Sequence, residues 1–327
     1  MKKFFGYFKI IISIALLLAL VWFMRDKLAS IGAIILSANK PIVFLCVLLI
    51  IIGIIIQSFR LKFLLDIQRI HLKIKDIVYL TFIGQFFNNV MPTAIGGDVI
   101  KAYFTSSGTD KKLETFTTIA VDRLLGAITI MWIAAVALIF NYKQIENKMI
   151  VIVVGVIFFA GTIFTLLIFN KKMLTNILFL RGLLRRFKLE EKLERFQEAI
   201  NKYSHHKIII FNALLLSLVS QVIYFFMTYL LALSISAPVS FMFLLLILPI
   251  IATVSMLPSL NGLGIRESGF VYFLGSAMGH EKAFALSLLY LGVGIAISLI
   301  GGVIFLFKKE FKHIELDKIS KISGGNI

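Results

Sequence analysis

The sequence predicts an all-α polytopic membrane protein, on the evidence of its composition, its long apolar segments and the positions of its charges. Of the 327 residues, 59% are hydrophobic and 16% are charged, and the mean hydropathy is +0.96. Soluble domains average about 45–50% apolar and about 25% charged residues. Apolar segments recur along the whole chain and leave no stretch for a separate soluble core. We therefore expect one integral membrane domain over residues 1–327.

Six apolar segments have the length of a membrane span. About 20 helical residues cross the roughly 30 Å hydrocarbon core. The first segment follows Lys2 and Lys3, as in a signal peptide. It lacks a small-residue cleavage site, so we expect it to be retained as an anchor. The six predicted spans are residues 7–24, 41–59, 113–140, 149–169, 208–235 and 282–307.

The net charge of +17 comes from Lys and Arg residues concentrated between the apolar segments and in the tail. This distribution is typical of positive-inside sorting, and it argues against nucleic acid as the partner. We therefore expect the N-terminus, the segment 170–207 and the basic tail 308–327 to be cytoplasmic. The same expectation covers a loop that carries Arg60, Lys62, Arg69, Lys73 and Lys75.

This orientation requires two re-entrant hairpins, since residues 77–104 and 240–281 must each leave and return on the same side. As a helix, residues 77–91 would be only about 22 Å long. A break follows at Pro92, Gly96 and Gly97, and a second break follows Pro258 with Gly262 and Gly264. With the six spans, the hairpins make eight apolar segments.

The two breaks align when 166 is added to the residue numbers of the first: Pro92 then corresponds to Pro258, and Gly96 to Gly262. The same offset aligns the predicted spans 41–59 and 113–140 with the predicted spans 208–235 and 282–307. The sequence therefore predicts inverted pseudo-repeats at 41–140 and 208–307, with a site formed by broken helices between them. Residues 170–207 would form an amphipathic linker, either bound to anionic lipid or simply joining the repeats.

Charged side chains gather around the breaks, in a chain that otherwise keeps charge outside its apolar segments. An unpaired charge at the centre of a bilayer costs roughly 2.5–3.5 kcal/mol on insertion scales, so these groups must pair, face water or bind a ligand. Lys101 and Glu267 are equivalent at the 166 offset, which predicts a charge pair or polar cluster between the repeats. Such a pair would either lock the repeats together or belong to a binding site.

We expect Arg266, with the free amides of Gly262 and Gly264 at a helix start, to hold an anionic head group. Lys101 could act in the same way from the first hairpin. Gln85, Asn88 and Asn89 would either cap freed backbone or contact a sugar or glycerol. The predicted substrate-binding set is Asn88, Asn89, Gly96, Gly97, Asp98, Lys101, Asp122, Arg123, Gly262, Gly264, Arg266 and Glu267.

The sequence contains no complete motif for catalysis, metal binding or cofactor binding. Cys46 is the single cysteine, and His205, His206 and His280 lack partners at metal-ligand spacing. The Gly262–Gly264 pair has neither a third glycine nor a preceding strand, which excludes a dinucleotide fingerprint. We predict no catalytic residues, no metal and no cofactor.

The motifs at the breaks resemble the lysylphosphatidylglycerol synthase transmembrane-region family. They are Phe86–Pro92 with Gly96-Gly97-Asp98, Val121-Asp122-Arg123-Leu124, and Pro258 leading to Gly262-Leu263-Gly264-Ile265-Arg266-Glu267. The resemblance implies a lipid or lipid-linked substrate, because the family includes the flippase half of the multiple peptide resistance factors. Some relatives are fused to glycosyltransferases acting on polyprenyl phosphates. The soluble aminoacyltransferase domain of the full-length synthases is absent from this sequence.

The resemblance and the site residues together predict a flippase-like lipid translocase in the cytoplasmic membrane. Its partner would be an anionic phospholipid, aminoacyl-phosphatidylglycerol or a polyprenyl-phosphate-linked lipid, supplied by a separate lipid-modifying synthase or glycosyltransferase. One alternative is a membrane enzyme of the phosphatidylglycerol lysyltransferase type, or its membrane subunit. Another is a secondary transporter of small solutes.

Overall fold

The computed structural model describes residues 15, 17–91, 96–107, 111–141, 148–169, 198–203, 205–255 and 262–308. These residues form helices and no strand. The elements in chain order are η1 (Arg25–Lys27), α2 (Leu28–Leu36), α3 (Lys40–Ile67), α4 (Ile74–Val90), α5 (Gly96–Ser106), α6 (Lys112–Asn141), α7 (Lys148–Phe169), α11 (Lys207–Ser234), α12 (Phe241–Val254), α13 (Ile265–Met278) and α14 (His280–Phe307).

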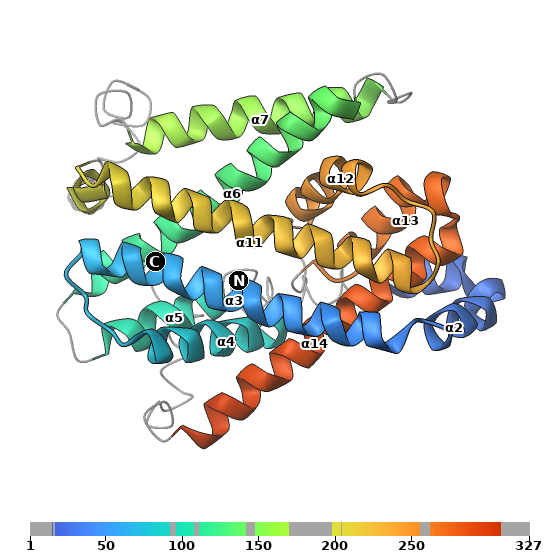
Figure 1. Cartoon of the computed structure of the whole chain (residues 1–327), viewed down its shortest axis with the longest axis horizontal. Helices are drawn as coiled ribbons and strands as arrows, with labels where there is room; N and C mark the ends of the chain where they lie inside the picture. The colour runs from blue at the N-terminus through green and yellow to red at the C-terminus, as the bar shows by residue number, and fades with distance from the viewer. Residues whose placement is uncertain are drawn as a thin grey trace.

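Helices α3 and α11 form the central pair of the molecule and lie side by side in opposite directions (Figure 1). The Asn39 amide before α3 donates to the Ser234 carbonyl at the end of α11. At the other end, the Gln68 side chain after α3 donates to the Ala199 carbonyl, eight positions before α11 begins (199 to 207). Both helices are mainly apolar, and their contact buries residues such as Cys46, Ile54 and Leu231 in the core.

Short helix pairs lie at the two opposite ends of this central pair (Figure 1). Helix α4 begins beyond the end of α3 and returns as α5, whereas α12 begins beyond the end of α11 and returns as α13. The four helices contain 17, 11, 14 and 14 residues. At 1.5 Å per residue they measure about 16–26 Å, which is less than the roughly 30 Å hydrocarbon core. Each pair therefore has the dimensions of a re-entrant hairpin.

Helix positions and helix contacts correspond between the two halves, α3–α6 and α11–α14. Helix α11 begins and ends 167 positions after α3 (40 to 207 and 67 to 234), one position more than the offset of the breaks. Helix α4 packs on α14, and its counterpart α12 packs on α6. The contact between α5 and α6 in the first half has its counterpart between α13 and α14 in the second. Likewise, the contact between α3 and α6 corresponds to the contact between α11 and α14. Two inverted copies of one unit would produce this pattern.

Four helices within the described residues are long and apolar enough to cross a membrane, namely α3, α6, α11 and α14. They match four of the predicted spans and establish an all-α polytopic membrane protein. Helix α7 covers the predicted span at 149–169, although its apolar segment Val151–Ile163 is shorter. Half of the predicted first span, residues 7–14 and 16, lies outside the described residues, as do the tail beyond Lys308 and most of the linker 170–207.

The prediction that Arg60 and Lys62 lie in a loop is wrong, because α3 continues to Ile67. With 28 residues, α3 is about 42 Å long and exceeds the hydrocarbon core. Lys62 forms an ion pair with Asp66 one turn later in the same helix, at 3.1 Å. Arg60 is buried and has a carboxylate partner from another helix, so a charge is tolerated inside the helix bundle.

Candidate functional site

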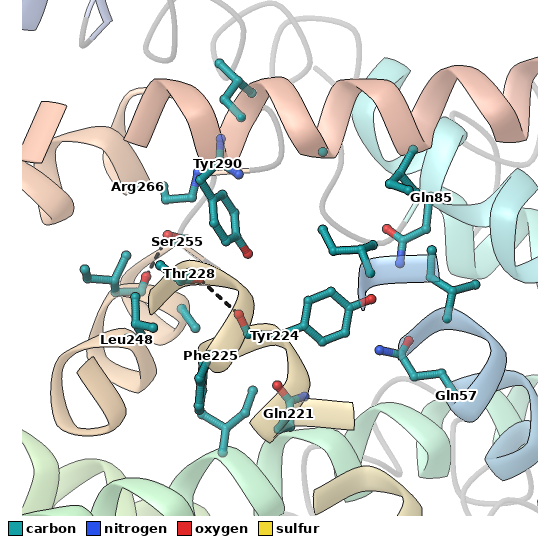
Figure 2. A pocket seen from close by; sticks show the side chains of 18 of the residues that line it. Gln57, Gln85, Gln221, Tyr224, Phe225, Thr228, Leu248, Ser255, Arg266 and Tyr290 are labelled. Carbon is teal, nitrogen blue, oxygen red and sulfur yellow. Dashed lines mark hydrogen bonds between the residues drawn. The ribbon is translucent and has the colours of Figure 1, made fainter. Parts of the chain in front are cut away.

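A cavity of about 590 Å³ lies between the two halves of the molecule, and both central helices line it (Figure 2). Each half contributes one arginine, Arg123 from α6 and Arg266 from α13. The described lining residues include no carboxylate. The remaining polar lining residues are the amides Gln57, Gln85, Asn89 and Gln221 and the hydroxyl-bearing Tyr224, Thr228, Ser255 and Tyr290.

In the first half, Arg123 is held by a carboxylate from the neighbouring hairpin helix. Its Nε lies 2.8 Å from Oδ2 of Asp98 in α5, while Oδ1 of Asp98 lies 2.7 Å from Nζ of Lys101. Asp98 is 7% exposed, whereas the Arg123 side chain is 49% exposed. The buried carboxylate thus anchors two cations, and the arginine extends from it toward the cavity.

In the second half, Arg266 is held by its neighbour in sequence. Its Nη2 donates to Oε1 of Glu267 at 2.6 Å, and its guanidinium carbon lies 5.2 Å from the ring centre of Tyr290. The other carboxylate oxygen of Glu267, which is fully buried, accepts a hydrogen bond from the Gly264 amide at 2.6 Å. Glu267 therefore orients the arginine and caps the start of α13 at the same time.

A third ion pair joins α3 to α6 away from the hairpins. The Nε and Nη2 atoms of Arg60 donate to the two oxygens of Asp122 at 2.6 and 2.8 Å, and Nη1 donates to Ser217 of α11 at 2.7 Å. Ser217 also lies 2.9 Å from the Thr129 hydroxyl. All four side chains are buried. This bidentate pair connects three of the long helices and satisfies the guanidinium group on three sides.

At the first break, Asn88, Asn89 and Gly97 have different structural roles. The Gly97 amide donates to Oδ1 of Asn88 at 2.8 Å, so Asn88 caps freed backbone at the start of α5. A Cβ on Gly97 would collide with the Gly84 carbonyl, which explains the glycine at this helix crossing. Asn89 lines the cavity instead. Residues 92–95 and 256–261, with Pro92 and Pro258, lie outside the described part of the chain.

Two expectations about the site are wrong. Lys101 and Glu267 do not pair with each other, because Asp98 and Arg266 lie nearer within the same helices, three positions and one position away. The Gly264 amide is not available to a ligand, because Glu267 occupies it. The two predicted arginines do line one cavity, and Asp98, Lys101 and Glu267 pack behind them.

Several lining residues were missed in the sequence, notably Gln57, Gln221, Tyr224 and Tyr290, as was the buried Arg60. Arg60 could have been found, because Leu61, Leu64 and Leu65 continue the helical spacing past it and indicate a longer helix. The tyrosines and glutamines carry no such signal, since single polar residues on apolar helices point in any direction until the helices are packed.

The arrangement is suited to binding an anion. Guanidinium groups form bidentate hydrogen bonds to phosphate and carboxylate. Here both arginines are positioned by their own carboxylates, so a ligand need not order them. No His, Cys, Asp or Glu belongs to the described lining of the cavity.

Comparison with known proteins gives the family of this chain. The model of the family described as "Lysylphosphatidylglycerol synthase TM region" matches residues 10–302 and so includes both hairpins. A UPF0104 membrane protein of Pyrococcus horikoshii is 27% identical over 95% of this chain and 98% of its own length. A UPF0104 membrane protein of Methanocaldococcus jannaschii is 32% identical over 36% of this chain and 34% of its own. No solved structure matches the chain. The chain is a multi-pass membrane protein that belongs to the lysylphosphatidylglycerol synthase TM-region family.

Proposed function

We propose that this protein is a flippase-like translocator that moves a lipid with an anionic head group across the cytoplasmic membrane. The observation that carries the proposal is the shared cavity, whose described lining has one arginine from each half and no carboxylate. Anionic phospholipids, aminoacyl-phosphatidylglycerol and polyprenyl-phosphate-linked lipids all carry a phosphate that these arginines would bind. A separate synthase or glycosyltransferase would supply the lipid.

The volume of the cavity supports a head group as the ligand. At about 590 Å³ it lies within the range of roughly 300–1,000 Å³ of small-molecule sites. The acyl or prenyl chains would remain in the surrounding lipid, so binding requires no free energy for transferring them into the protein.

The proposed mechanism uses the correspondence between the two halves. We propose that residues 41–140 and 208–307 are inverted repeats, with both chain ends in the cytoplasm. Rocking of one repeat against the other would open the cavity alternately to the two leaflets. Arg123 and Arg266 belong to different repeats, so an anionic head group bound by both would remain at the junction while access changes sides.

The test is translocation of fluorescent or aminoacylated lipids by the purified protein in proteoliposomes. We expect wild-type protein to move at least one anionic lipid faster than the Arg266→Ala, Glu267→Ala double variant. We expect the same deficit for Arg123→Ala. Arg25→Ala is the matched control, since Arg25 pairs locally with Asp26 and lies outside the cavity. Equal rates for wild type and both cavity variants, across all the lipids, would refute the proposal.

The same preparation tests the alternative of a phosphatidylglycerol lysyltransferase. Aminoacyl transfer to lipid needs groups that move protons, and the described lining of the cavity offers no His, Cys, Asp or Glu. We therefore expect no product from labelled lysyl-tRNA and phosphatidylglycerol. Formation of lysyl-phosphatidylglycerol by this chain alone would overturn the assignment as a translocator.

A further inference from the structure

The cavity offers more polar groups than an anion requires, and these groups are uncharged. Gln57 comes from α3, Gln85 from α4 and Gln221 from α11, so three helices supply carboxamides to one space (Figure 2). Gln57 and Gln85 lie on the side toward which the Tyr224 ring extends, opposite Arg266 and Tyr290. The carboxamides of Gln57 and Gln85 thus lie across the cavity from Arg266.

Two of the carboxamides are available to a ligand. Within the described part of the chain, Gln85 and Gln221 line the cavity and their side chains make no hydrogen bond, whereas the Gln57 side chain is hydrogen-bonded to Tyr224. A polar group at membrane depth is costly unless it is satisfied, so such groups mark ligand sites. Asn88 provides the contrast, because its side chain is occupied by the Gly97 amide.

Within the described residues, the carboxylates that support the two cavity arginines and the neighbouring Arg60 are already neutralised. Asp98 is paired with Lys101 and Arg123, Asp122 with Arg60, and Glu267 with Arg266. A ligand ammonium group would therefore find two guanidinium groups and no counter-ion among the described lining residues. Like charges at short range repel strongly where water is excluded, so a lipid whose head group ends in one or two ammonium groups fits this cavity poorly.

Aromatic rings complete the lining. Tyr224, Tyr290, Phe225 and Phe270 all border the cavity, and the Phe270 and Tyr290 ring centres are 5.8 Å apart. Flat apolar rings pack against the C–H faces of sugars and polyols, whereas carboxamides exchange hydrogen bonds with their hydroxyl groups as both donor and acceptor.

We infer that the head group is a phosphodiester followed by a neutral, hydroxyl-rich group such as a polyol or a sugar. This inference rests on the proposed function and narrows its substrate. Arg123 and Arg266 bind the phosphate, and the carboxamides with the tyrosines bind the hydroxyl-bearing part. The lipid is therefore a phospholipid with a polyol or sugar head, or a polyprenyl-phosphate sugar, and aminoacylated lipid is a poor ligand.

The first experiment measures binding of matched lipids to the protein in nanodiscs. Phosphatidylmethanol, phosphatidylglycerol and phosphatidylinositol share one phosphodiester charge and can share acyl chains, but their heads carry an increasing number of hydroxyl groups. Lysyl-phosphatidylglycerol adds two ammonium groups. A neutral hydrogen bond is worth a factor of roughly three to ten in affinity. We expect phosphatidylglycerol or phosphatidylinositol to bind at least that much tighter than phosphatidylmethanol, and lysyl-phosphatidylglycerol to bind weakest.

Equal affinities for phosphatidylmethanol and the hydroxyl-bearing lipids would overturn the inference, as would tightest binding of lysyl-phosphatidylglycerol. A polyprenyl-phosphate hexose with a short prenyl chain separates the two sources of this chemistry. If the polyprenyl-phosphate hexose binds more tightly than phosphatidylinositol, the ligand is a lipid-linked sugar; if it binds more weakly, the ligand is a phospholipid. Both results support the shared head-group chemistry.

The second experiment uses Gln85→Met and Gln221→Met, which nearly preserve side-chain volume and remove the carboxamide. We expect each to reduce affinity for phosphatidylglycerol or phosphatidylinositol by roughly three- to tenfold. Affinity for phosphatidylmethanol should be unchanged, which also shows that the variant is folded. Arg123→Gln should instead weaken all three lipids alike. A uniform loss from the Gln variants would contradict the assignment.

Translocation of the same lipids separates this inference from the proposed function. If lysyl-phosphatidylglycerol moves fastest, the protein is a translocator and the head-group inference is wrong. If the hydroxyl-bearing lipids bind as expected but none of the tested lipids moves, the binding site stands and the function as a translocator fails.

Discussion

The two halves present an arginine to the same cavity but support it in different ways. Arg123 is held across helices, because its partner Asp98 lies in α5 and also binds Lys101. Arg266 is held within one helix by Glu267, which also caps that helix. The first support depends on packing between α5 and α6, whereas the second is built into α13. The two halves thus supply the same functional group from positions that do not correspond, one in α6 and one in α13, through unrelated local solutions.

The largest effect should come from the ion pair that only the first half has. At the offset of 167, Arg60 and Asp122 correspond to Met227 and Leu289, so the second half replaces the pair by apolar side chains (60 to 227, 122 to 289). Removal of one partner from a buried ion pair costs about 3–5 kcal/mol, because a charge remains buried alone. We expect Asp122→Leu to lose this much in the free energy of unfolding, measured by denaturant titration in detergent.

The matched control is the double variant Arg60→Met, Asp122→Leu, which copies the second half. Apolar replacement of a whole buried pair is often neutral or stabilising. We expect the double variant to recover most of the loss of Asp122→Leu. If it is less stable than the single variant, the pair does more than join α3, α6 and α11.

The two supporting carboxylates should differ in the same assay. Asp98→Asn removes the carboxylate charge that pairs with both Lys101 and Arg123, so we expect a loss of about 3 kcal/mol. Glu267→Gln keeps an acceptor for the Gly264 amide, and Arg266 keeps its contact with Tyr290. We expect a loss of about 1.5 kcal/mol there. A larger loss of unfolding free energy for Glu267→Gln than for Asp98→Asn would show that the support of Arg266 depends on more than contacts within α13.

Glycines at the two breaks should respond to alanine for different reasons. Gly97→Ala places a methyl group against the Gly84 carbonyl, and overpacking of this kind costs about 1–3 kcal/mol. Gly264 has φ 82°, a conformation that costs an L-residue about 1–2 kcal/mol. Gly292→Ala is the control, because its Cβ would meet no atom within 4 Å. Unfolding free energies of all three variants test this; a Gly97→Ala protein as stable as Gly292→Ala would contradict the close crossing.

The smallest effects should come from the links at the far ends of the bundle. Lys308 Nζ, just after α14, lies 3.1 Å from Asp76 in α4, and the Asn141 amide at the end of α6 donates to the Met242 carbonyl in α12. These positions correspond between the halves (141 to 308). Each link is partly exposed, so Lys308→Ala and Asn141→Ala should each cost about 1 kcal/mol or less in unfolding free energy. A loss larger than that of Glu267→Gln would show that these contacts at the ends of the helix bundle, rather than those around the cavity, contribute most to joining the two halves.

Much of this organisation could be predicted from the sequence, because it depends on local properties. Long apolar segments, Pro and Gly at the breaks, and the short arms between them predicted the spans and the helices of both hairpins. The neighbouring Arg266 and Glu267 were placed at the site for the same reason. In contrast, the pairing of Arg123 with Asp98 and of Arg60 with Asp122 requires knowing which helices pack together. The offset suggested a Lys101–Glu267 pair, but proximity within each hairpin decided the actual partners.

The central claim is that one anionic group is held by arginines from both halves, and a double-mutant cycle tests it most directly. The variants are Arg123→Gln, Arg266→Gln and their combination, with affinity for phosphatidylglycerol measured in nanodiscs. A hydrogen bond to a charged group is worth about 1.5–3 kcal/mol, so each single variant should lose roughly ten- to a hundredfold in affinity. If both arginines bind the same phosphate, the double variant loses clearly less than the product of the single losses. Losses that multiply would show two independent sites and contradict the shared one.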